Sequence, residues 1–421
     1  MGSDSLRAMC VAAAVLVLTL ARPHLTMAVQ AAPFELPRPT GARAVGTTTW
    51  HVDDPSRPES FAPGNTREVQ VLAWYPTRST AGERAPYLRA GAVEAQRFAT
   101  MVRAPGGFDH VAAFRTHAVL DAPPDGSRLP LLVFSHGYTS AASSHTALLE
   151  DLASHGYVVL SVVHPYEAIS ASLADGRVVS VLDDGDVVRQ PIRQVFDEWA
   201  TEDAVMSAVT SESDTARRDE RLRAYLKTLG HTGMALRRWV DDTKLVLDRF
   251  AKAPANSLAF RLARTIDSTR IGVFGHSMGG VTAGQFCVED TRCRAGLNLD
   301  GIPQSGTMID GTFGRPFLMV YSARPGRLGA SDTIYRRAAA PYYRVDVRDT
   351  LHLDFSDFPF WDGPLAQRGA FGALGGARAT SITRAIVREY FDQELLGRRS
   401  PLLAGKTTFP EVTIAVSGTK P

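Results

Sequence analysis

The sequence predicts an α/β protein in which helices cover both faces of a mostly parallel sheet. Short apolar runs of the length of buried strands recur along the chain, and segments with helical spacing of apolar residues separate them. With 421 residues, 44% of them hydrophobic and 21% charged, the chain has enough apolar material for a large core. A net charge of +2 gives no strong attraction to nucleic acid, so we expect no nucleic-acid partner.

Residues 1–31 have the order of a secretory signal peptide. Arg7 precedes an apolar run over residues 10–21, and small residues follow as far as Ala31. The run is shorter than a helix needs to span a bilayer comfortably, so a retained membrane anchor is the less favoured alternative. We therefore expect an exported protein, periplasmic or secreted, that keeps residues 32–421. Two cysteines would then remain, Cys287 and Cys293, and whether they form a disulfide stays open.

The first strand–helix–strand unit is predicted over residues 131–163. Before it, alternating residues at 68–75 predict a half-exposed strand. Residues 131–134 are a continuous apolar run typical of a buried parallel strand, and residues 146–154 have helical spacing before Gly156. The apolar run at 157–163 completes a parallel βαβ unit.

A helical insertion is predicted over about residues 180–252. Its middle part, residues 197–228, is rich in charge. Its last part carries an apolar stripe that indicates core contacts, formed by Leu236, Trp239, Val240, Val246, Leu247 and Phe250. We therefore expect one domain over 32–421, with this insertion before the next strand and a tail at about 397–421.

After Asp267 the alternation of strands and helices resumes. Residues 271–274 predict a strand, and a helix follows as far as Glu289. The remaining elements are three apolar strands and one amphipathic helix, at 295–299, 317–321, 342–347 and 382–395.

The clearest chemical signal is the pattern G-x-S-x-G at Gly275–Gly279. An apolar strand precedes it and a helical segment follows it, which is the context of a nucleophile elbow in the α/β-hydrolase fold. In that turn, side chains on the two glycines would collide with the neighbouring strand and helix. We expect Ser277 to be the nucleophile of a serine hydrolase.

The partners of such a serine follow in the order serine, acid, histidine. His352 is the one histidine C-terminal to Ser277, so we expect it to be the general base. The acid stays open between two residues that follow strands, Asp300 and Asp332.

Two backbone N–H groups should stabilise the oxyanion. One belongs to Met278, the residue after the nucleophile, and the other to Tyr138, where Gly137 lets the loop turn inward. We interpret His136 as a residue that fixes this loop. The sequence contains no metal-site or nucleotide-binding motif, so we expect no metal and no cofactor.

The chain resembles the secreted platelet-activating factor acetylhydrolases (the lipoprotein-associated phospholipase A2 type) and their bacterial relatives. The resemblance covers roughly residues 68–395, except for the insertion. It rests on short motifs at residues 134–137, 151–156, 270–280, 289–290, 299–300 and 352–358. The paired leucine and aspartate at 299–300, and His352 followed by Asp-Phe-Ser-Asp at 354–357, are its more specific parts.

The resemblance implies calcium-independent hydrolysis of short or oxidised sn-2 acyl groups of phospholipids, with transient contact to a lipid interface. It favours Asp300 as the acid and agrees with Tyr138 and Met278 as oxyanion donors. A cutinase-like or general carboxylesterase, including a polyester hydrolase, is the enzymatic alternative, and the cutinase-like arrangement would use Asp332. A catalytically silent, lipid-binding hydrolase fold is the alternative outside enzymes. The sequence leaves the oligomeric state open.

Overall fold

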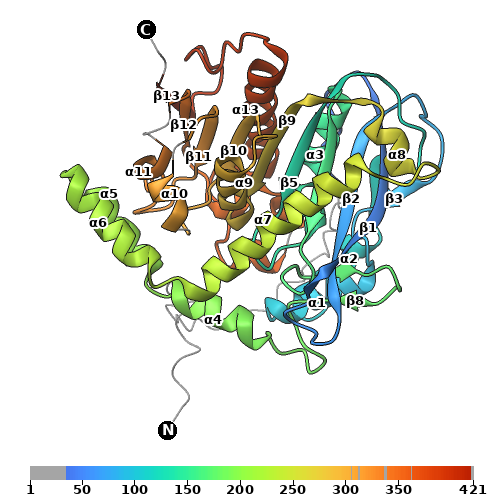
Figure 1. Ribbon diagram of the computed structural model, residues 1–421, viewed down its shortest axis with the longest axis horizontal. Helices are drawn as coiled ribbons and strands as arrows, with labels where there is room; N and C mark the ends of the chain where they lie inside the picture. The colour runs from blue at the N-terminus through green and yellow to red at the C-terminus, as the bar shows by residue number, and fades with distance from the viewer. Residues whose placement is uncertain (1–34, 305, 312, 336–338, 362, 419–421) are drawn as a thin grey trace, which may run out of the picture.

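The computed structural model describes residues 35–304, 306–311, 313–335, 339–361 and 363–418, so the expected signal peptide at 1–31 lies outside the described residues. In the described ranges, one sheet of eleven strands is flanked by helices (Figure 1). The predicted α/β class is thereby confirmed. None of the helices in these ranges is long and apolar enough to span a membrane.

The strands of the large sheet follow one another across it in an order that differs from their order in the chain. From one edge to the other they are β13 (Val412–Ser417), β12 (Tyr342–Val347), β11 (Phe317–Tyr321), β10 (Ala295–Leu299), β9 (Ile266–His276), β5 (Leu129–Ser135), β6 (Val158–Val163), β2 (Thr66–Thr77), β1 (Ala44–Pro58), β4 (Arg115–Leu120) and β3 (Arg84–Pro86). Two short strands, β7 (Ala171–Ser172) and β8 (Val178–Val179), pair separately.

Parallel pairing joins the neighbouring strands from β12 through β11, β10, β9 and β5 to β6. The carboxyl ends of these strands therefore lie at one edge, which is where ligands bind in open α/β sheets. Antiparallel pairs extend the sheet at both sides, β13 on β12 and β2 on β6.

The helices fall into connecting helices and a group that precedes β9. They are α1 (Ala92–Met101), α2 (Asp109–Ala112), α3 (Thr146–Ser154), α4 (Gln190–Trp199), α5 (Glu202–Ser211), α6 (Thr215–Leu226), α7 (Gly230–Ala251), α8 (Leu258–Ala263), α9 (Met278–Glu289), α10 (Gly306–Asp310), α11 (Asp332–Tyr335), α12 (Pro364–Gln367) and α13 (Gly376–Leu396). Three short 3-10 helices add η1 (Ala142–His145), η2 (His352–Phe355) and η3 (Phe358–Phe360).

The sheet separates two hydrophobic cores. In β5, Leu131 and Val133 face the core that α7 and α9 cover, and Leu132 and Phe134 face the core that α3 and α13 cover. Successive side chains of a strand point to opposite faces, so a strand buried on both faces is apolar throughout. This is why the buried strands stand out in the sequence as continuous apolar runs.

The predicted insertion contains two parts with different packing. Helix α7 lies on the sheet and contacts α9 and strands β1, β2 and β6, and it crosses in front of the sheet in Figure 1. Helix α6 instead contacts α5, α10 and α11 at one side of the sheet. Helices α5 and α6 therefore stand apart from the helix layers that cover the sheet, and α4, which contacts α7, connects to that layer.

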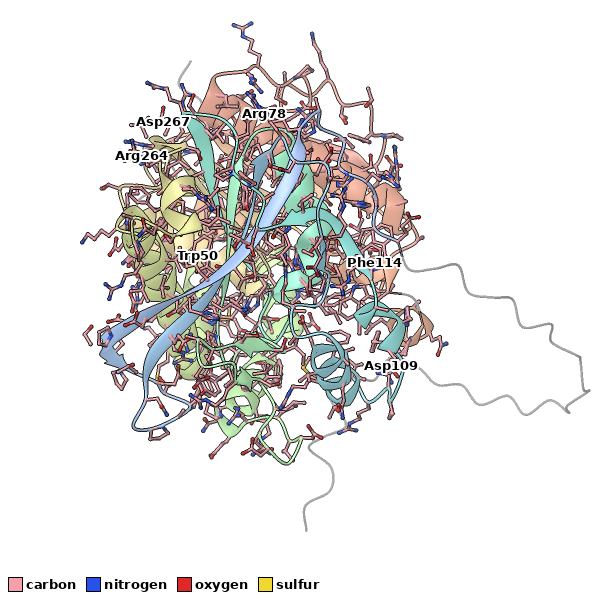
Figure 2. The ribbon with its side chains drawn as sticks, turned by 90° about the vertical axis from the view of Figure 1, so that its right-hand side faces the viewer. Trp50, Arg78, Asp109, Phe114, Arg264 and Asp267 are labelled. Atoms are coloured by element: carbon pink, nitrogen blue, oxygen red, sulfur yellow. A yellow bond between two sulfur atoms is a disulfide. The ribbon has the colours of Figure 1, made fainter. Side chains whose placement is uncertain are left out.

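Strands β1, β4 and β3, which lie beyond β2 at one edge of the sheet, were not predicted. Figure 2 shows this side, with Trp50 on the long strand β1. Strand β1 mixes polar and apolar residues with several charges and two prolines, so no regular alternation marks it. At the other end of the sheet, β13 lies inside the predicted tail and pairs with β12.

Candidate active site

Ser277 occupies the bend between β9 and α9 at the carboxyl end of β9. Its backbone angles, φ 56° and ψ −126°, are unfavourable for a residue with a side chain. Hydrogen bonds maintain this conformation: the N–H of Ser277 donates to the carbonyl of Leu299 at 2.8 Å, and the N–H of Gly280 donates to the carbonyl of Ser277 at 2.9 Å. The bend leaves the serine partly exposed at the sheet edge.

Close backbone contacts explain the two glycines that flank the bend. A Cβ added to Gly275 would lie 2.2 Å from the carbonyl carbon of Gly279, and one added to Gly279 would lie 2.0 Å from the carbonyl oxygen of Ser135. Atoms that are not bonded to each other cannot approach so closely. Strand β9, helix α9 and the end of β5 can therefore meet only with glycine at both positions, as the sequence pattern requires.

His352 lies in the loop after β12, at the start of η2, and its side chain is 25% exposed. Its Nδ1 is 2.7 Å from Oδ2 of Asp300. Because a carboxylate oxygen only accepts, Nδ1 carries the proton of the neutral ring and donates it. Nε2 is then left as the atom that can accept a proton.

Asp300 follows β10 and is buried, with 4% of its surface exposed. Besides His352, the N–H of Ser322 donates to its Oδ1 at 2.7 Å and the Ser322 hydroxyl donates to its Oδ2 at 2.9 Å. Burial by itself raises the pKa of this carboxyl, but the hydrogen bond and charge of His352 and the Ser322 N–H outweigh it. The pKa of Asp300 lies below its ordinary value, so the group is ionised at neutral pH.

The loop of His352 lies against the residue that precedes Ser277. The Nε2–H of His276 donates to the carbonyl of His352 at 2.9 Å, and the two imidazole rings lie 4.5 Å apart between their centroids. In the part of the chain that the structure describes, the Ser277 hydroxyl makes no hydrogen bond. Its Oγ can therefore rotate toward a partner, as is usual before substrate binds.

Asp332, the other candidate acid, lies in α11 among different partners. Its Oδ2 accepts from Nη1 of Arg344 at 2.8 Å, and its Oδ1 accepts from the hydroxyl groups of Tyr342 at 2.6 Å and Tyr321 at 3.2 Å. The structure thus brings Asp300, and not Asp332, into contact with His352.

The two predicted oxyanion donors lie on either side of the serine. A Cβ added to Gly137 would be 3.4 Å from Cβ of Ser277, so the loop that carries Tyr138 adjoins the bend. Met278 is the first residue of α9. Among the described residues, the backbone N–H groups of Tyr138 and Met278 have no hydrogen-bond partner. Both remain available to a ligand.

His136 fixes the loop of Tyr138. Its Nδ1–H donates to the carbonyl of Gly137 at 2.7 Å, and the N–H of Ser140 donates to the same carbonyl at 3.0 Å. In a trans peptide unit the C=O and the following N–H point in opposite directions. These two bonds therefore also set the direction of the Tyr138 N–H. The interpretation of His136 as a loop-fixing residue agrees with these contacts.

A buried ionic network beneath this loop was not predicted. Asp242 of α7 binds the guanidinium of Arg67 through two bonds of 2.6 and 3.1 Å, and its Oδ2 accepts from Nδ1 of His164 at 2.9 Å. The N–H of His164 in turn donates to Nε2 of His136 at 3.3 Å. No motif could have revealed this network, since its members come from separate elements.

Helix α4 packs over the side chain of Tyr138. The ring of Tyr138 lies 5.5 Å from that of Trp199, 6.1 Å from that of Phe196 and 5.9 Å from that of Trp239. The insertion therefore contacts the loop of Tyr138 directly.

The aromatic residues after His352 mainly fill the core. Phe355, Phe358 and Trp361 are at most 3% exposed, and Phe360 is half-buried. The two cysteines whose state was open, Cys287 and Cys293, form a disulfide. Within the described ranges, no three His, Cys, Asp or Glu side chains gather as metal ligands would.

The sequence is similar to proteins of known name. It is 25% identical over 254 residues to the platelet-activating factor acetylhydrolase of Cavia porcellus, covering 57% of this chain and 51% of that protein. The Bos taurus protein of the same name is 25% identical over 247 residues, covering 56% and 50%. The chain thus spans about half the length of these curated relatives.

A solved structure is similar over nearly its whole length. The ferulic acid esterase from Streptomyces cinnamoneus matches with a TM-score of 0.69 and 29% identity, covering 91% of this chain and 99% of that chain. The family model described as platelet-activating factor acetylhydrolase, isoform II, matches residues 113–377, which include Ser277, Asp300 and His352. The suspected resemblance is thereby confirmed: the chain belongs to the platelet-activating factor acetylhydrolase family.

Proposed function

We propose that this protein is a serine hydrolase that cleaves carboxylic esters through an acyl-enzyme. The observation that carries the proposal is the pair of His352 and buried Asp300, 2.7 Å apart, at the same sheet edge as the strained bend of Ser277. Family membership and the similarity to an esterase structure also support it.

The residues would act in two stages. In the first, Oγ of Ser277 attacks the ester carbonyl carbon while Nε2 of His352 removes its proton, and the N–H groups of Tyr138 and Met278 bind the oxyanion. His352 then protonates the departing alcohol, and the acyl-enzyme remains. In the second stage His352 activates water, which releases the acid and restores Ser277. Asp300 holds the imidazole in the required tautomer throughout and stabilises its protonated form.

For the substrate, we propose short-acyl phospholipids, cleaved without calcium at a transient lipid contact, because the curated relatives are named platelet-activating factor acetylhydrolases. A simple carboxylic ester is the second candidate. The ferulic acid esterase structure favours this candidate, because the chain covers that structure almost completely. The chain covers only half of the curated relatives. The Cys287–Cys293 disulfide supports our further proposal that the protein is exported, since disulfides persist in oxidising compartments.

The test compares wild type with Ser277→Ala and His352→Ala on p-nitrophenyl esters of graded chain length and on a short-acyl phospholipid, with and without a chelator. Each variant should lose roughly a million-fold in kcat, because members of such a triad act as a unit. Ser268→Ala, an exposed serine at the opposite end of β9, is the matched control and should keep wild-type activity.

Labelling by a fluorophosphonate distinguishes the enzyme from a silent hydrolase fold. We expect labelling of the wild type and of Ser268→Ala, and none of Ser277→Ala. An unlabelled wild type, or a loss below tenfold in Ser277→Ala, would contradict the proposed function. The relative rates on phospholipid and on simple esters decide between the two substrate candidates.

A further inference from the structure

The loop that follows β11 brings an arginine to the candidate active site. Its first residue, Ser322, donates two hydrogen bonds to Asp300. The N–H of Ala323 donates to the carbonyl of Thr350 at 2.9 Å, two residues before His352. Arg324 therefore follows directly on backbone that contacts both the acid and the loop of the base.

The guanidinium of Arg324 has no hydrogen-bond partner among the described residues, although its side chain is only 29% exposed. The acidic group paired with it is Asp203 of α5, at 3.7 Å. That carboxylate already accepts from Nε of Arg327 at 2.8 Å and is 78% exposed. Arg327, in contrast, is 4% exposed and also binds Glu202 at 2.8 Å. Arg327 thus ties α5 to the loop, and the donors of Arg324 remain unused.

The charge of Arg324 acts on the catalytic edge. The pKa of His276, the residue before Ser277, is lowered to about 3, mainly by burial and further by the charges of His352 and Arg324. Burial raises the pKa of Asp300, and the charge of Arg324 is among the influences that lower it, after those of His352 and Ser322. Asp300 lies beside Ser277, because Leu299, the residue before Asp300, accepts a hydrogen bond from the N–H of Ser277 at 2.8 Å. Ser322 binds Asp300, so the loop of Arg324 brings a cation to the sheet edge where a substrate of Ser277 would bind.

A guanidinium presents a planar set of N–H donors that matches a carboxylate or a phosphate. A neutral ester offers no such group, and the proposed hydrolysis needs no cation at this position. We propose that Arg324 binds a negatively charged group of the ester substrate, an inference that rests on the proposed function. The anion would be a carboxylate on the acyl side or a phosphodiester on the alcohol side.

The experiment uses two pairs of esters that differ in charge. The p-nitrophenyl monoester of glutaric acid is compared with p-nitrophenyl pentanoate, and dihexanoyl phosphatidylglycerol is compared with dihexanoylglycerol. Each is measured with wild type, Arg324→Gln and Arg324→Lys. Arg270→Gln is the matched control: Arg270 is 39% exposed and also has an ion pair of 3.7 Å, with Asp267. Arg270 lies in the first half of β9, away from Ser277, and its partner Asp267 is labelled at the upper left of Figure 2.

In Arg324→Gln, we expect kcat/KM for the preferred anionic ester to fall roughly ten- to a hundredfold, the usual range for a lost charged hydrogen bond. The loss should be mainly in KM, because binding of a remote group is felt in the ground state as well as in the transition state. The neutral ester of the pair should change less than about twofold. Arg324→Lys should restore part of the preference, and salt should weaken it in wild type. The pair that shows the effect identifies carboxylate or phosphodiester as the source of the charge.

Equal losses on charged and neutral esters in Arg324→Gln would overturn the inference, because Arg324 would then act through Asp300 or the fold. Unchanged kinetics on both anionic esters would also overturn it. In either case Ser277-dependent turnover of the neutral esters would leave the proposed function intact. Absence of turnover on all four esters, with no fluorophosphonate labelling, would refute the proposed function together with this inference.

Discussion

The substitution Asp300→Asn tests the proposed acid with almost no change in shape. Asp300 accepts from three donors: Nδ1–H of His352, and the N–H and hydroxyl of Ser322. Asparagine replaces one carboxylate oxygen by an NH₂ group that only donates. If this NH₂ group faced the N–H of Ser322, two buried N–H donors would point at each other without an acceptor, at a cost of about 1–3 kcal/mol.

The amide therefore favours the opposite orientation, with its NH₂ toward Nδ1 of His352. His352 must then accept at Nδ1 and carry its proton on Nε2. In that tautomer it cannot remove the proton of Ser277. We expect kcat to fall about 10⁴-fold, as other triads lose on the same change.

The assay is kcat on p-nitrophenyl acetate, with circular dichroism to verify folding. Asp332→Asn is the matched control, because Asp332 is also buried but binds Arg344, Tyr321 and Tyr342 instead. It should cost less than about tenfold in kcat, with its main effect on stability. If Asp300→Asn kept more than a tenth of kcat while Asp332→Asn lost activity, the reasoning would be refuted and the cutinase-like arrangement favoured.

Two further predictions concern stability. Burial raises the pKa of Asp357 to about 7 from its ordinary 3.8, so the folded state binds this proton more tightly and the free energy of unfolding falls as pH rises from about 4 to about 7. In wild type this loss amounts to up to about 4 kcal/mol, and it should be absent in Asp357→Asn. If urea unfolding of the variant showed the same dependence on pH as wild type, the prediction would be contradicted. The Cys287–Cys293 disulfide closes a loop of sequence separation 6, so replacing both cysteines by alanine should lower the free energy of unfolding by about 2 kcal/mol and leave kcat unchanged. An unaltered urea midpoint would argue against this effect.

Local pattern was sufficient for the centre of the sheet. The predicted ranges 295–299, 317–321 and 342–347 coincide with β10, β11 and β12, and the predicted helix 146–154 coincides with α3. Strands β10 and β11 are buried throughout, so their residues are almost all apolar, whereas β12 keeps four buried apolar residues beside half-buried Arg344 and Asp346. The edge strand β13 is different: only Val412 is buried and its other residues are half-buried or exposed, so no continuous buried run marks it and its pairing with β12 defines it.

The helical insertion shows the same limit. Its apolar stripe correctly indicated that α7 packs into the core. The sequence did not indicate where α4–α6 lie, because their contacts are with residues distant in the chain: Trp199 with Tyr138, and Glu202 with Arg327. Those contacts place the insertion beside the candidate active site.

The sequence by itself determined the bend at Ser277, since the two flanking glycines and the apolar strand before them are local requirements. It also limited the candidate base to His352 through chain order. It left Asp300 and Asp332 open, because both follow strands of the same sheet. Only the tertiary structure decided which carboxylate contacts His352, and only it brought Arg324 to the same edge. Hydrogen bonds and charges act through space, and parallel strands far apart in the sequence end side by side.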